Sequence, residues 1–200
     1  MNIAGVIIAG GTGSRIGGHK PVLPFGDGVL LDAIVARAKP QVEELALNVP
    51  GADAPYYRER YAGIDLVFDS HDAGPLGGLI AGLNWLQCLG GAELLATFPC
   101  DTPFLPLDLV RQLRAAAHGR VPVVAADDVR THALCGLWPL SIARRLCAGF
   151  EAGELRSMMS AVEALGGHIC HIKCGEHAFL NINTRADLTR AELIRTQREP

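Results

Sequence analysis

The sequence predicts an α/β protein with a three-layer, Rossmann-like fold, built on a mostly parallel sheet with a small antiparallel element. Apolar runs rich in β-branched residues alternate with longer helical patterns along the 200-residue chain. Several of these runs, among them VIIA, ELLATF and VPVVAA, are apolar throughout, as are strands that are covered on both faces. Alternating strands and helices imply right-handed crossovers, and therefore parallel neighbouring strands.

The expected elements follow one another along the chain. Strands fall on the apolar runs at about 3–9, 43–49, 64–68, 93–98, 121–126, 133–138 and 168–173. Helices fall on the longer patterns at about 29–38, 76–89, 106–118, 140–149, 155–165 and 185–196. Only the polar turn DDVRTH separates the two runs within 121–138, which predicts a hairpin. No repeat or linker divides the chain, so we expect residues 1–200 to form a single domain.

The composition is that of a soluble globular protein, with 49% hydrophobic and 20% charged residues. A net charge of −3 offers no broad basic field, so no nucleic-acid partner is expected. No stretch approaches the ~18 apolar residues of a membrane helix, and no basic segment precedes the short apolar run at the N-terminus. We therefore expect a cytoplasmic protein with no membrane partner, whose six cysteines are reduced.

A glycine-rich loop with two cations follows the first strand. The stretch IIAGGTGSRIGGHK lacks the third glycine of a dinucleotide fingerprint, which would stand at Ile16. It also fails as a Walker loop, because His19 separates Gly18 from Lys20. Successive backbone N–H groups in such loops still bind anions, and Arg15 and Lys20 add positive charge. The stretch therefore favours a phosphate-binding loop over a tight turn with solvated cations.

Polar residues follow three further strands, at the edge where open α/β sheets bind ligands. Asp101, in the stretch PCDTP, is placed to hold Mg²⁺, which prefers one or two carboxylates together with phosphate oxygens and water. The alternative role for Asp101 is to cap the helix expected at 106–118. Asn48 and Asp69 come at the ends of the second and third strands, and Asp69 is placed to face a nucleotide.

The His- and Cys-rich stretch HICHIKCGEH, at 168–177, raises the alternative of a zinc or redox protein. It lacks the closely spaced ligand pairs of zinc sites. Strand alternation puts Cys170 and Cys174 on one face with Ile172, which indicates core packing.

Four stretches together resemble the molybdenum cofactor guanylyltransferase family. They are IAGGTGSRIGG, PCDTPFLP, DAGPLGGLIAGLNW and FLNINT, and the resemblance runs from residue 3 to about residue 188. It implies a nucleotidyltransferase domain of the GT-A type. The implied reaction depends on Mg²⁺ and converts GTP and molybdenum-bound molybdopterin to the guanine dinucleotide cofactor and pyrophosphate. The resemblance also implies transient contacts with proteins that donate or accept the cofactor.

The same resemblance implies roles for individual residues along the carboxyl edge of the sheet. The residues matched to GTP binding are Ala9, Gly10, Gly11, Gly13, Lys20, Asn48, Asp69 and Asp101. The residues matched to catalysis are Arg15, Lys20 and Asp101, with Asp101 also the ligand of Mg²⁺. Asn181 and Asn183 match a late segment on the side of the pterin substrate.

One departure from the family concerns the lysine. The guanylyl-transferring family usually reads R-M-G-G-x-D-K, whereas this chain reads RIGGHK at 15–20, without the aspartate and with the lysine one residue earlier. The shorter spacing resembles cytidylyl-transferring relatives, while Gly10 and PCDTP favour guanine. The alternatives are a cytidylyltransferase for the same pterin, a sugar-phosphate nucleotidyltransferase, and a non-catalytic nucleotide-binding partner protein.

Overall fold

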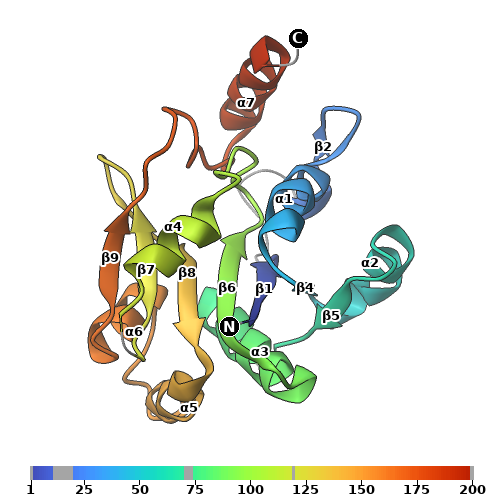
Figure 1. Ribbon diagram of the computed structural model, residues 1–200. Helices are drawn as coiled ribbons and strands as arrows, with labels where there is room; N and C mark the ends of the chain where they lie inside the picture. Colours follow the sequence, from blue (N-terminus) through green and yellow to red (C-terminus); the bar gives the residue numbers. More distant parts are fainter. Residues whose placement is uncertain (1, 11–19, 70–73, 119, 199–200) are drawn as a thin grey trace.

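The computed structural model describes residues 2–10, 20–69, 74–118 and 120–198, and its centre is a seven-stranded mixed sheet (Figure 1). The strand order is β5-β4-β1-β6-β8-β7-β9. The strands are β1 (Asn2–Ile8), β4 (Glu44–Asn48), β5 (Asp65–Val67), β6 (Ala92–Pro99), β7 (Val123–Ala126), β8 (Thr131–Pro139) and β9 (His168–His171). β1, β4, β5 and β6 are parallel, β8 is antiparallel to β6 and β7, and β9 is parallel to β7.

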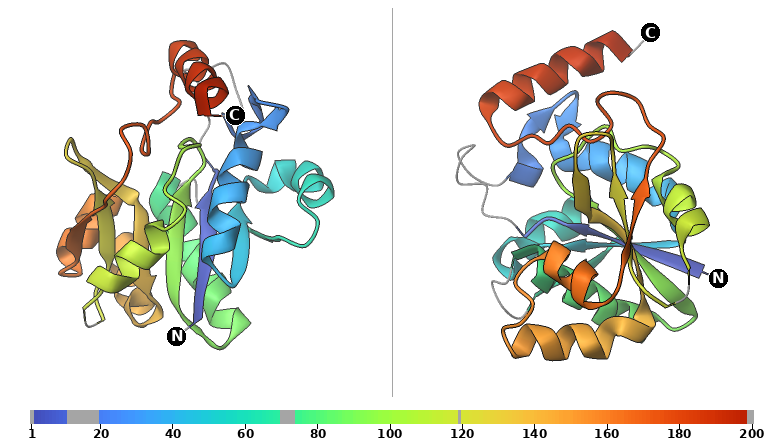
Figure 2. Two further views of the ribbon diagram at one scale, coloured as in Figure 1. Left: turned by 45° about the horizontal axis from the view of Figure 1, so that its top comes forward. Right: turned by 90° about the vertical axis from the view of Figure 1, so that its left-hand side faces the viewer.

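Helices cover both faces of the sheet, which gives three layers (Figure 2). They are α1 (Leu30–Ala38), α2 (Ala54–Arg60), α3 (Gly74–Leu89), α4 (Leu109–Ala116), α5 (Ala143–Glu151), α6 (Met158–Ala164) and α7 (Arg185–Arg198). On one face, Leu31 and Ile34 of α1 share a buried cluster with Ile7 of β1 and with residues of α4. On the other face, Val6 of β1 shares a cluster with Leu79 of α3 and with residues of α5 and α6. Alternation along β1 therefore divides its side chains between two core layers.

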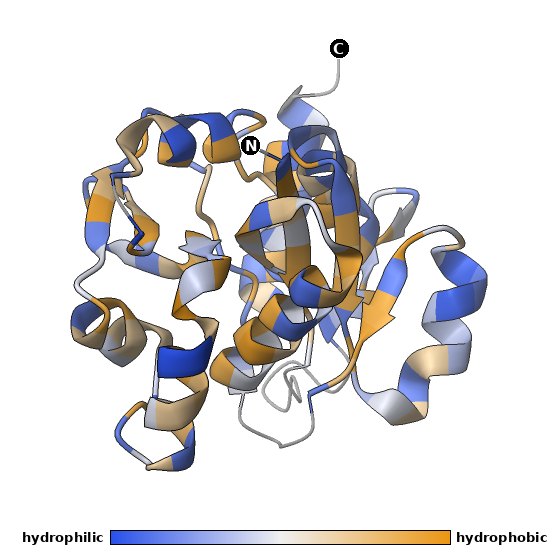
Figure 3. Cartoon of the chain, turned by 60° about the horizontal axis from the view of Figure 1, so that its bottom comes forward, coloured by the Kyte–Doolittle hydropathy of each residue, from blue (hydrophilic) through white to orange (hydrophobic). Residues whose placement is uncertain are grey.

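Hydrophobic residues concentrate on the strands of the sheet, whereas α2, at the β5 edge, is largely hydrophilic (Figure 3). Tyr57 is the large buried side chain of α2, and it packs in the same cluster as α1. Among the residues that the structure describes, no helix combines the length and the hydrophobicity needed to cross a membrane.

Two glycines spaced four residues apart let α3 lie close to the sheet. A Cβ atom at Gly82 would come within 2.9 Å of side-chain atoms of both Val6 and Leu95. A Cβ atom at Gly78 would lie 2.5 Å from Asn48 Oδ1. Real Cβ atoms do not approach other heavy atoms this closely, so a larger residue at either position would force the neighbouring side chains to shift. This close approach accounts for the glycine spacing in GPLGGLIAGL, and it brings α3 against the end of β4.

The segment 172–184 contains no helix or strand, and it carries the chain from β9 across the end of β6 to α7. We call it the crossing segment. Its Ile182 packs with Phe25, Phe104 and Ile194 in a third buried cluster. The Glu192 carboxylate of α7 accepts a hydrogen bond from the Gly26 N–H (2.8 Å), which fastens α7 to the hairpin formed by β2 (Pro24–Phe25) and β3 (Gly28–Val29). The C-terminal part of the chain thus returns to the segment that follows the glycine-rich loop.

All the expected strands and helices are present, with ends displaced by about three residues or fewer. The structure adds α2 and the β2–β3 hairpin, which are too short to give a periodic pattern. The expectation for Cys174 is wrong. β9 ends at His171, the last ladder bond runs from the Ile172 N–H to the Ala126 carbonyl (2.8 Å), and Cys174 is exposed. The backbone leaves the sheet there, so Cys174 shares no strand face with Cys170.

Candidate active site

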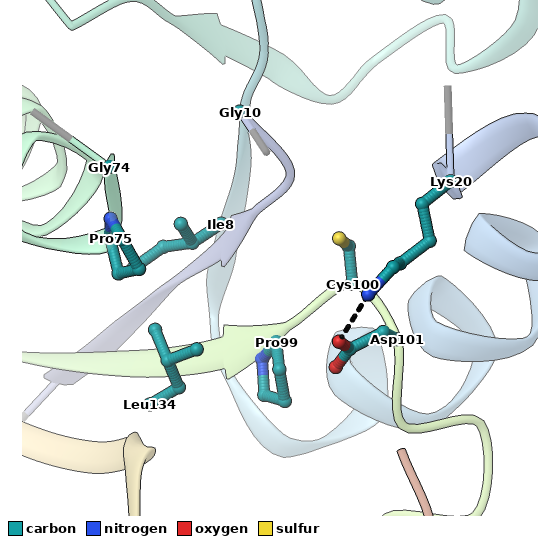
Figure 4. Close-up of a pocket in the computed structure, with 9 residues that line it drawn as sticks. All are labelled: Ile8, Gly10, Lys20, Gly74, Pro75, Pro99, Cys100, Asp101 and Leu134. Carbon is teal, nitrogen blue, oxygen red and sulfur yellow. Dashed lines mark hydrogen bonds and ion pairs between the residues drawn. The ribbon is translucent and has the colours of Figure 1, made fainter. Parts of the chain in front are cut away.

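The candidate site lies at the carboxyl edge of the sheet, between β1 and β6. β4 flanks β1 on one side and β6 on the other, so the strand order reverses here, where open α/β sheets bind ligands. Ile8 pairs with Pro99 in the register of the two strands, which places the residues that follow them side by side. A cavity of 160 Å³ opens at this point (Figure 4). Its lining residues are Ile8, Gly10, Lys20, Gly74, Pro75, Pro99, Cys100, Asp101 and Leu134.

Asp101 follows β6 and is held from both ends. Its backbone carbonyl accepts a hydrogen bond from the Ile182 N–H (2.9 Å). Its carboxylate Oδ2 lies 3.0 Å from Lys20 Nζ, and its Oδ1 lies 3.2 Å from Thr102 Oγ1. Asp101 does not cap a helix, because α4 begins at Leu109 and Asp108 stands at its N-cap position. The Asp101 side chain lines the cavity instead.

Lys20 reaches Asp101 from a short 3-10 turn, Lys20–Val22, which is anchored by the buried Pro21. Its ammonium donates to Asp101 Oδ2 (3.0 Å) and to Asn183 Oδ1 (2.7 Å). The side chains of Lys20 and Asp101 are only 15% and 18% exposed. Partial exclusion of water strengthens the attraction between the two charges, which stabilises the pair in the site without ligands.

The crossing segment supplies the two asparagines that the sequence singles out. Asn183 Oδ1 accepts from Lys20, as described above. Asn181 Oδ1 lies 2.8 Å from Thr102 Oγ1, whose other neighbour is Asp101 Oδ1. A hydroxyl has one proton to donate, so Thr102 links Asn181 and the carboxylate by serving one oxygen at a time. The structure thus brings Lys20, Asp101, Asn181 and Asn183 into one connected group.

A second polar group meets at the ends of β1, β4 and β5. A Cβ atom at Gly10 would lie 3.4 Å from Asn48 Oδ1 and 3.9 Å from Asp69 Oδ2, so the three residues are neighbours. Asn48 is fully buried, its Nδ2 donates to the Val67 carbonyl (3.4 Å), and its Oδ1 has no hydrogen-bond partner among the residues that the structure describes. A buried acceptor without a partner is costly, and it is available to a donor group on a ligand.

A second cavity, of 330 Å³, adjoins the first, and both are bordered by Pro75, Pro99, Asp101 and Leu134. Residues of β8, α6 and the crossing segment form its other walls. These residues include Arg130, Thr131, His132, Ser157, Met158, Met159 and Asn181. Asp101 therefore stands between two cavities, one reaching Gly10 and the other reaching Asn181.

Cys100, which lines the first cavity, is poorly suited to act as a nucleophile. Burial, reinforced by the charge of Asp101, raises the pKa of the Cys100 thiol to about 12, although Lys20 opposes the shift. The neighbouring Cys135 is also buried, and burial raises its pKa further. Thiols with such pKa values stay protonated at neutral pH, so the chemistry of the site lies with its oxygen and ammonium groups.

The donor atoms around Lys20 Nζ suit a divalent cation. Among the described residues, no three His, Cys, Asp or Glu side chains come together as a complete metal site. Asp101 Oδ2 and Asn183 Oδ1 already hold one cation, the lysine ammonium. Mg²⁺ takes one or two carboxylates and completes its shell with phosphate oxygens and water, so a single carboxylate beside a nucleotide fits this metal.

Four predicted residues remain, and the structure does not show them as part of either polar group. Gly11, Gly13 and Arg15 lie outside the described residues. Ala9 is buried, and its N–H donates to the Asn48 carbonyl (2.9 Å), so this N–H is used within the sheet. Sequence reasoning missed Thr102 and His132 as site residues. Their places in the sequence gave only an indirect signal: Thr102 directly follows Asp101 in PCDTP, and His132 ends the expected turn DDVRTH.

Solved structures of other proteins share the α/β fold that carries this site. The molybdopterin-guanine dinucleotide biosynthesis protein A of Archaeoglobus fulgidus covers 97% of this chain and 99% of its own, with a TM-score of 0.78 and 20% identity. The 4-diphosphocytidyl-2C-methyl-D-erythritol synthase of Anaerococcus prevotii covers 98% and 96%, with a TM-score of 0.74 and 17% identity. At these identities the likeness concerns the fold alone.

The chain belongs to the MobA-like NTP transferase family, whose model matches residues 5–167. The molybdenum cofactor guanylyltransferase of Cereibacter sphaeroides is 43% identical over 197 residues, which is 97% of each chain. The protein of the same name from Acidiphilium cryptum is 38% identical over 195 residues, which is 96% of this chain and 94% of its own. The family that the sequence motifs indicated is therefore confirmed.

Proposed function

We infer that this protein transfers GMP from GTP to molybdenum-bound molybdopterin, which gives the guanine dinucleotide cofactor and pyrophosphate. One observation carries the inference. Asp101, paired with Lys20, stands between two adjoining cavities at the strand reversal, so two substrates have room on either side of one carboxylate. The names of relatives up to 43% identical over nearly the full chain support guanine and molybdopterin as those substrates.

In the proposed reaction, the terminal phosphate of the pterin attacks the α-phosphorus of GTP in line. An oxygen of the pterin phosphate forms the new bond to the α-phosphorus. The bond between the α-phosphorus and the oxygen that bridges it to the β-phosphorus breaks, and pyrophosphate leaves with the negative charge. Such transfers need positioning and charge neutralisation rather than a protein nucleophile. The Lys20 ammonium lies within hydrogen-bond reach of the site carboxylate and can turn to a phosphate oxygen. Arg15 would add a second positive charge.

We propose Asp101 as the ligand of Mg²⁺, with Asn183 beside it. The oxygen donors described above fit this metal. When bound with the nucleotide, Mg²⁺ would offset negative charge on the phosphates. Asp101 would orient the triphosphate, and Lys20 would release the carboxylate and neutralise charge on the phosphates instead.

The nucleotide is proposed to occupy the side of Gly10, Asn48 and Asp69. The unpartnered Asn48 Oδ1, close to Asp69 Oδ2, supports a ligand that donates hydrogen bonds, as the N1–H and amino group of guanine or the hydroxyls of ribose do. Gly11 and Gly13 would add backbone N–H groups to the phosphates. The pterin is proposed to occupy the second cavity, on the side of Asn181 and Asn183.

A transfer assay that compares GTP with CTP tests the proposal. We expect pyrophosphate release and dinucleotide formation with GTP, and little product with CTP at equal concentration. Saturation by CTP with indifference to GTP would favour a cytidylyltransferase, the alternative raised by the lysine spacing. Nucleotide binding without turnover would favour a non-catalytic partner protein.

Substitutions at the carboxylate and the lysine test the same mechanism. Asp101→Asn and Lys20→Ala should each lower the rate of transfer by roughly 10²–10³-fold, as expected when one charge-stabilising group is lost. Melting temperatures close to that of the original protein would show that the fold is intact. Near-normal transfer by either purified variant contradicts the assignment.

The proposal also concerns the domain organisation, the cellular compartment and the protein partners. We propose that residues 1–200 act as one transferase domain in the cytoplasm, which the free state of all six cysteines supports. Transient contacts with cofactor-donating and cofactor-accepting proteins are part of the same proposal.

A further inference from the structure

The crossing segment reaches the site at three successive residues. Asn181 contacts the threonine that follows Asp101, the Ile182 N–H donates to the Asp101 carbonyl (2.9 Å), and Asn183 accepts from Lys20 (2.7 Å). The position of this segment therefore sets the position of two side chains beside the carboxylate. The contacts that hold the crossing segment in place therefore also affect the geometry of the site.

Upstream of these contacts, the segment is held by a ring stack. The Phe179 ring lies on the His132 ring, with centroids 4.1 Å apart and planes inclined by only 13°. Both residues are buried, at 6% and 9% exposure. Two residues of extended chain span at most about 7 Å, so the stack lies close to Asn181. No regular helix or strand includes residues 172–184, so a side-chain contact of this kind has unusual influence on where the segment lies.

His132 is itself fixed, by the turn of the β7–β8 hairpin. Its Nε2 lies 3.0 Å from Asp127 Oδ2, without the alignment of a hydrogen bond. Asp127 Oδ1 accepts from the N–H groups of Val129 (2.9 Å) and Arg130 (2.8 Å). Burial raises the pKa of Asp127, but these N–H groups and His132 outweigh it and hold the pKa at about 2. Asp127 is therefore an anchored carboxylate at neutral pH.

We propose that His132 is a positioning residue for the pterin side of the site, because its stack on Phe179 sets where the crossing segment places Asn181 against Thr102. The functional consequence rests on the proposed transfer reaction. His132 and Asn181 both line the second cavity. The nucleotide side, around Asn48, lies at the ends of β1, β4 and β5, which β6 separates from β8 in the sheet.

The proposal separates the two substrates in a kinetic test. We would compare His132→Ala, which removes the stack, with His132→Phe, which keeps an aromatic face, and use His171→Ala at an exposed histidine of β9 as the control. H132A should lower kcat/KM for the pterin substrate by roughly 10–100-fold, since a displacement of about 1 Å can cost ~10²-fold. The dissociation constant for GTP should change less than about twofold. H132F should recover at least roughly a third of the activity, and H171A should behave as the original protein.

Hydrogen–deuterium exchange gives a readout that does not depend on turnover. Amides of residues 178–184 should exchange faster in H132A than in H132F or the original protein, while amides of residues 44–49 exchange unchanged. Unaltered exchange at 178–184 in H132A would overturn the proposal, as would equal acceleration throughout the chain. Equal loss of GTP and pterin binding in H132A would also overturn it. If the original protein transfers no GMP, the proposed function fails, and the exchange result still decides whether His132 positions the segment.

Discussion

Lys20 Nζ lies 3.0 Å from Asp101 Oδ2, and Asn183 Oδ1 completes the contact at 2.7 Å. The two charged residues are separated by 81 positions in the sequence, and both side chains are less than a fifth exposed. The ammonium therefore occupies the position of a cation at the carboxylate proposed to hold Mg²⁺. Before that carboxylate can bind a metal fully, the lysine must move, and the phosphates of an incoming nucleotide offer it a new partner.

This relationship predicts opposite effects of one substitution on metal binding and on turnover. Lys20→Met should bind Mn²⁺ without nucleotide up to roughly fivefold more tightly, because a partly exposed ion pair contributes up to about 1 kcal/mol. The same variant should transfer GMP far more slowly. Electron paramagnetic resonance of free Mn²⁺ measures the affinity. Lys39→Met, at an exposed lysine, is the matched control, and Asp101→Asn should abolish the site. Equal or weaker Mn²⁺ binding by K20M would contradict the competition.

Asn48 should be more important for binding than for folding. Its Oδ1 is buried and has no partner in the described part of the chain, so the unliganded protein already bears the cost of an unsatisfied acceptor. Asn48→Ala should weaken GTP binding about tenfold, the equivalent of roughly one hydrogen bond, while the unliganded protein keeps its melting temperature within a few degrees. Thermal melts with and without GTP measure both effects. A large loss of unliganded stability with unchanged GTP affinity would assign Asn48 a purely structural role.

Thr97 should stabilise the junction of β6 and β8. Its Oγ1 accepts from Trp138 Nε1 (3.0 Å) and from the Gly136 N–H (3.2 Å), and Thr97 and Trp138 are almost fully buried. Thr97→Val keeps the shape but leaves buried donors unpaired, so the free energy of unfolding should fall by about 2 kcal/mol. Thr97→Ser keeps the acceptor and should lose much less. Urea unfolding followed by tryptophan fluorescence provides the comparison, and equal stability of the two variants would refute the argument.

His132 should make stability depend on pH. Burial lowers its pKa, Asp127 opposes the shift, and the positive charge of Arg130 adds to it. When folding lowers the pKa of a histidine, its contribution to stability is complete at pH values above the pKa of the unfolded chain, about 6.5. This contribution is lost as the pH falls through the pKa of the folded protein. The free energy of unfolding should therefore fall between about pH 7.5 and about pH 5, and less steeply in H132F. Urea titrations at stepped pH give the two slopes. Parallel slopes would exclude His132 as the source.

The sequence predicted which polar residues lie at the carboxyl edge of the sheet. Asn48 and Asp101 each end or follow an apolar run, Lys20 follows the glycine-rich loop, and open sheets bind ligands at the ends of their strands. It did not predict the partners of these residues. Thr102 and His132 look like ordinary loop and hairpin residues until the crossing segment lies against them. α2 and the β2–β3 hairpin were missed because elements of seven and two residues are too short for a period to appear.

The sequence by itself determined the order and type of the main elements, the family, and the strand ends that carry polar side chains. These depend on local patterns of hydrophobicity and on short motifs, both of which can be read from the sequence before the chain folds. Tertiary structure alone decided that Asn183 meets Lys20 across 163 positions, that no described residue donates to Asn48 Oδ1, and that Phe179 stacks on His132. Such contacts depend on the orientation of segments that have no regular structure, such as the crossing segment. The packing of side chains that are distant in the sequence sets this orientation.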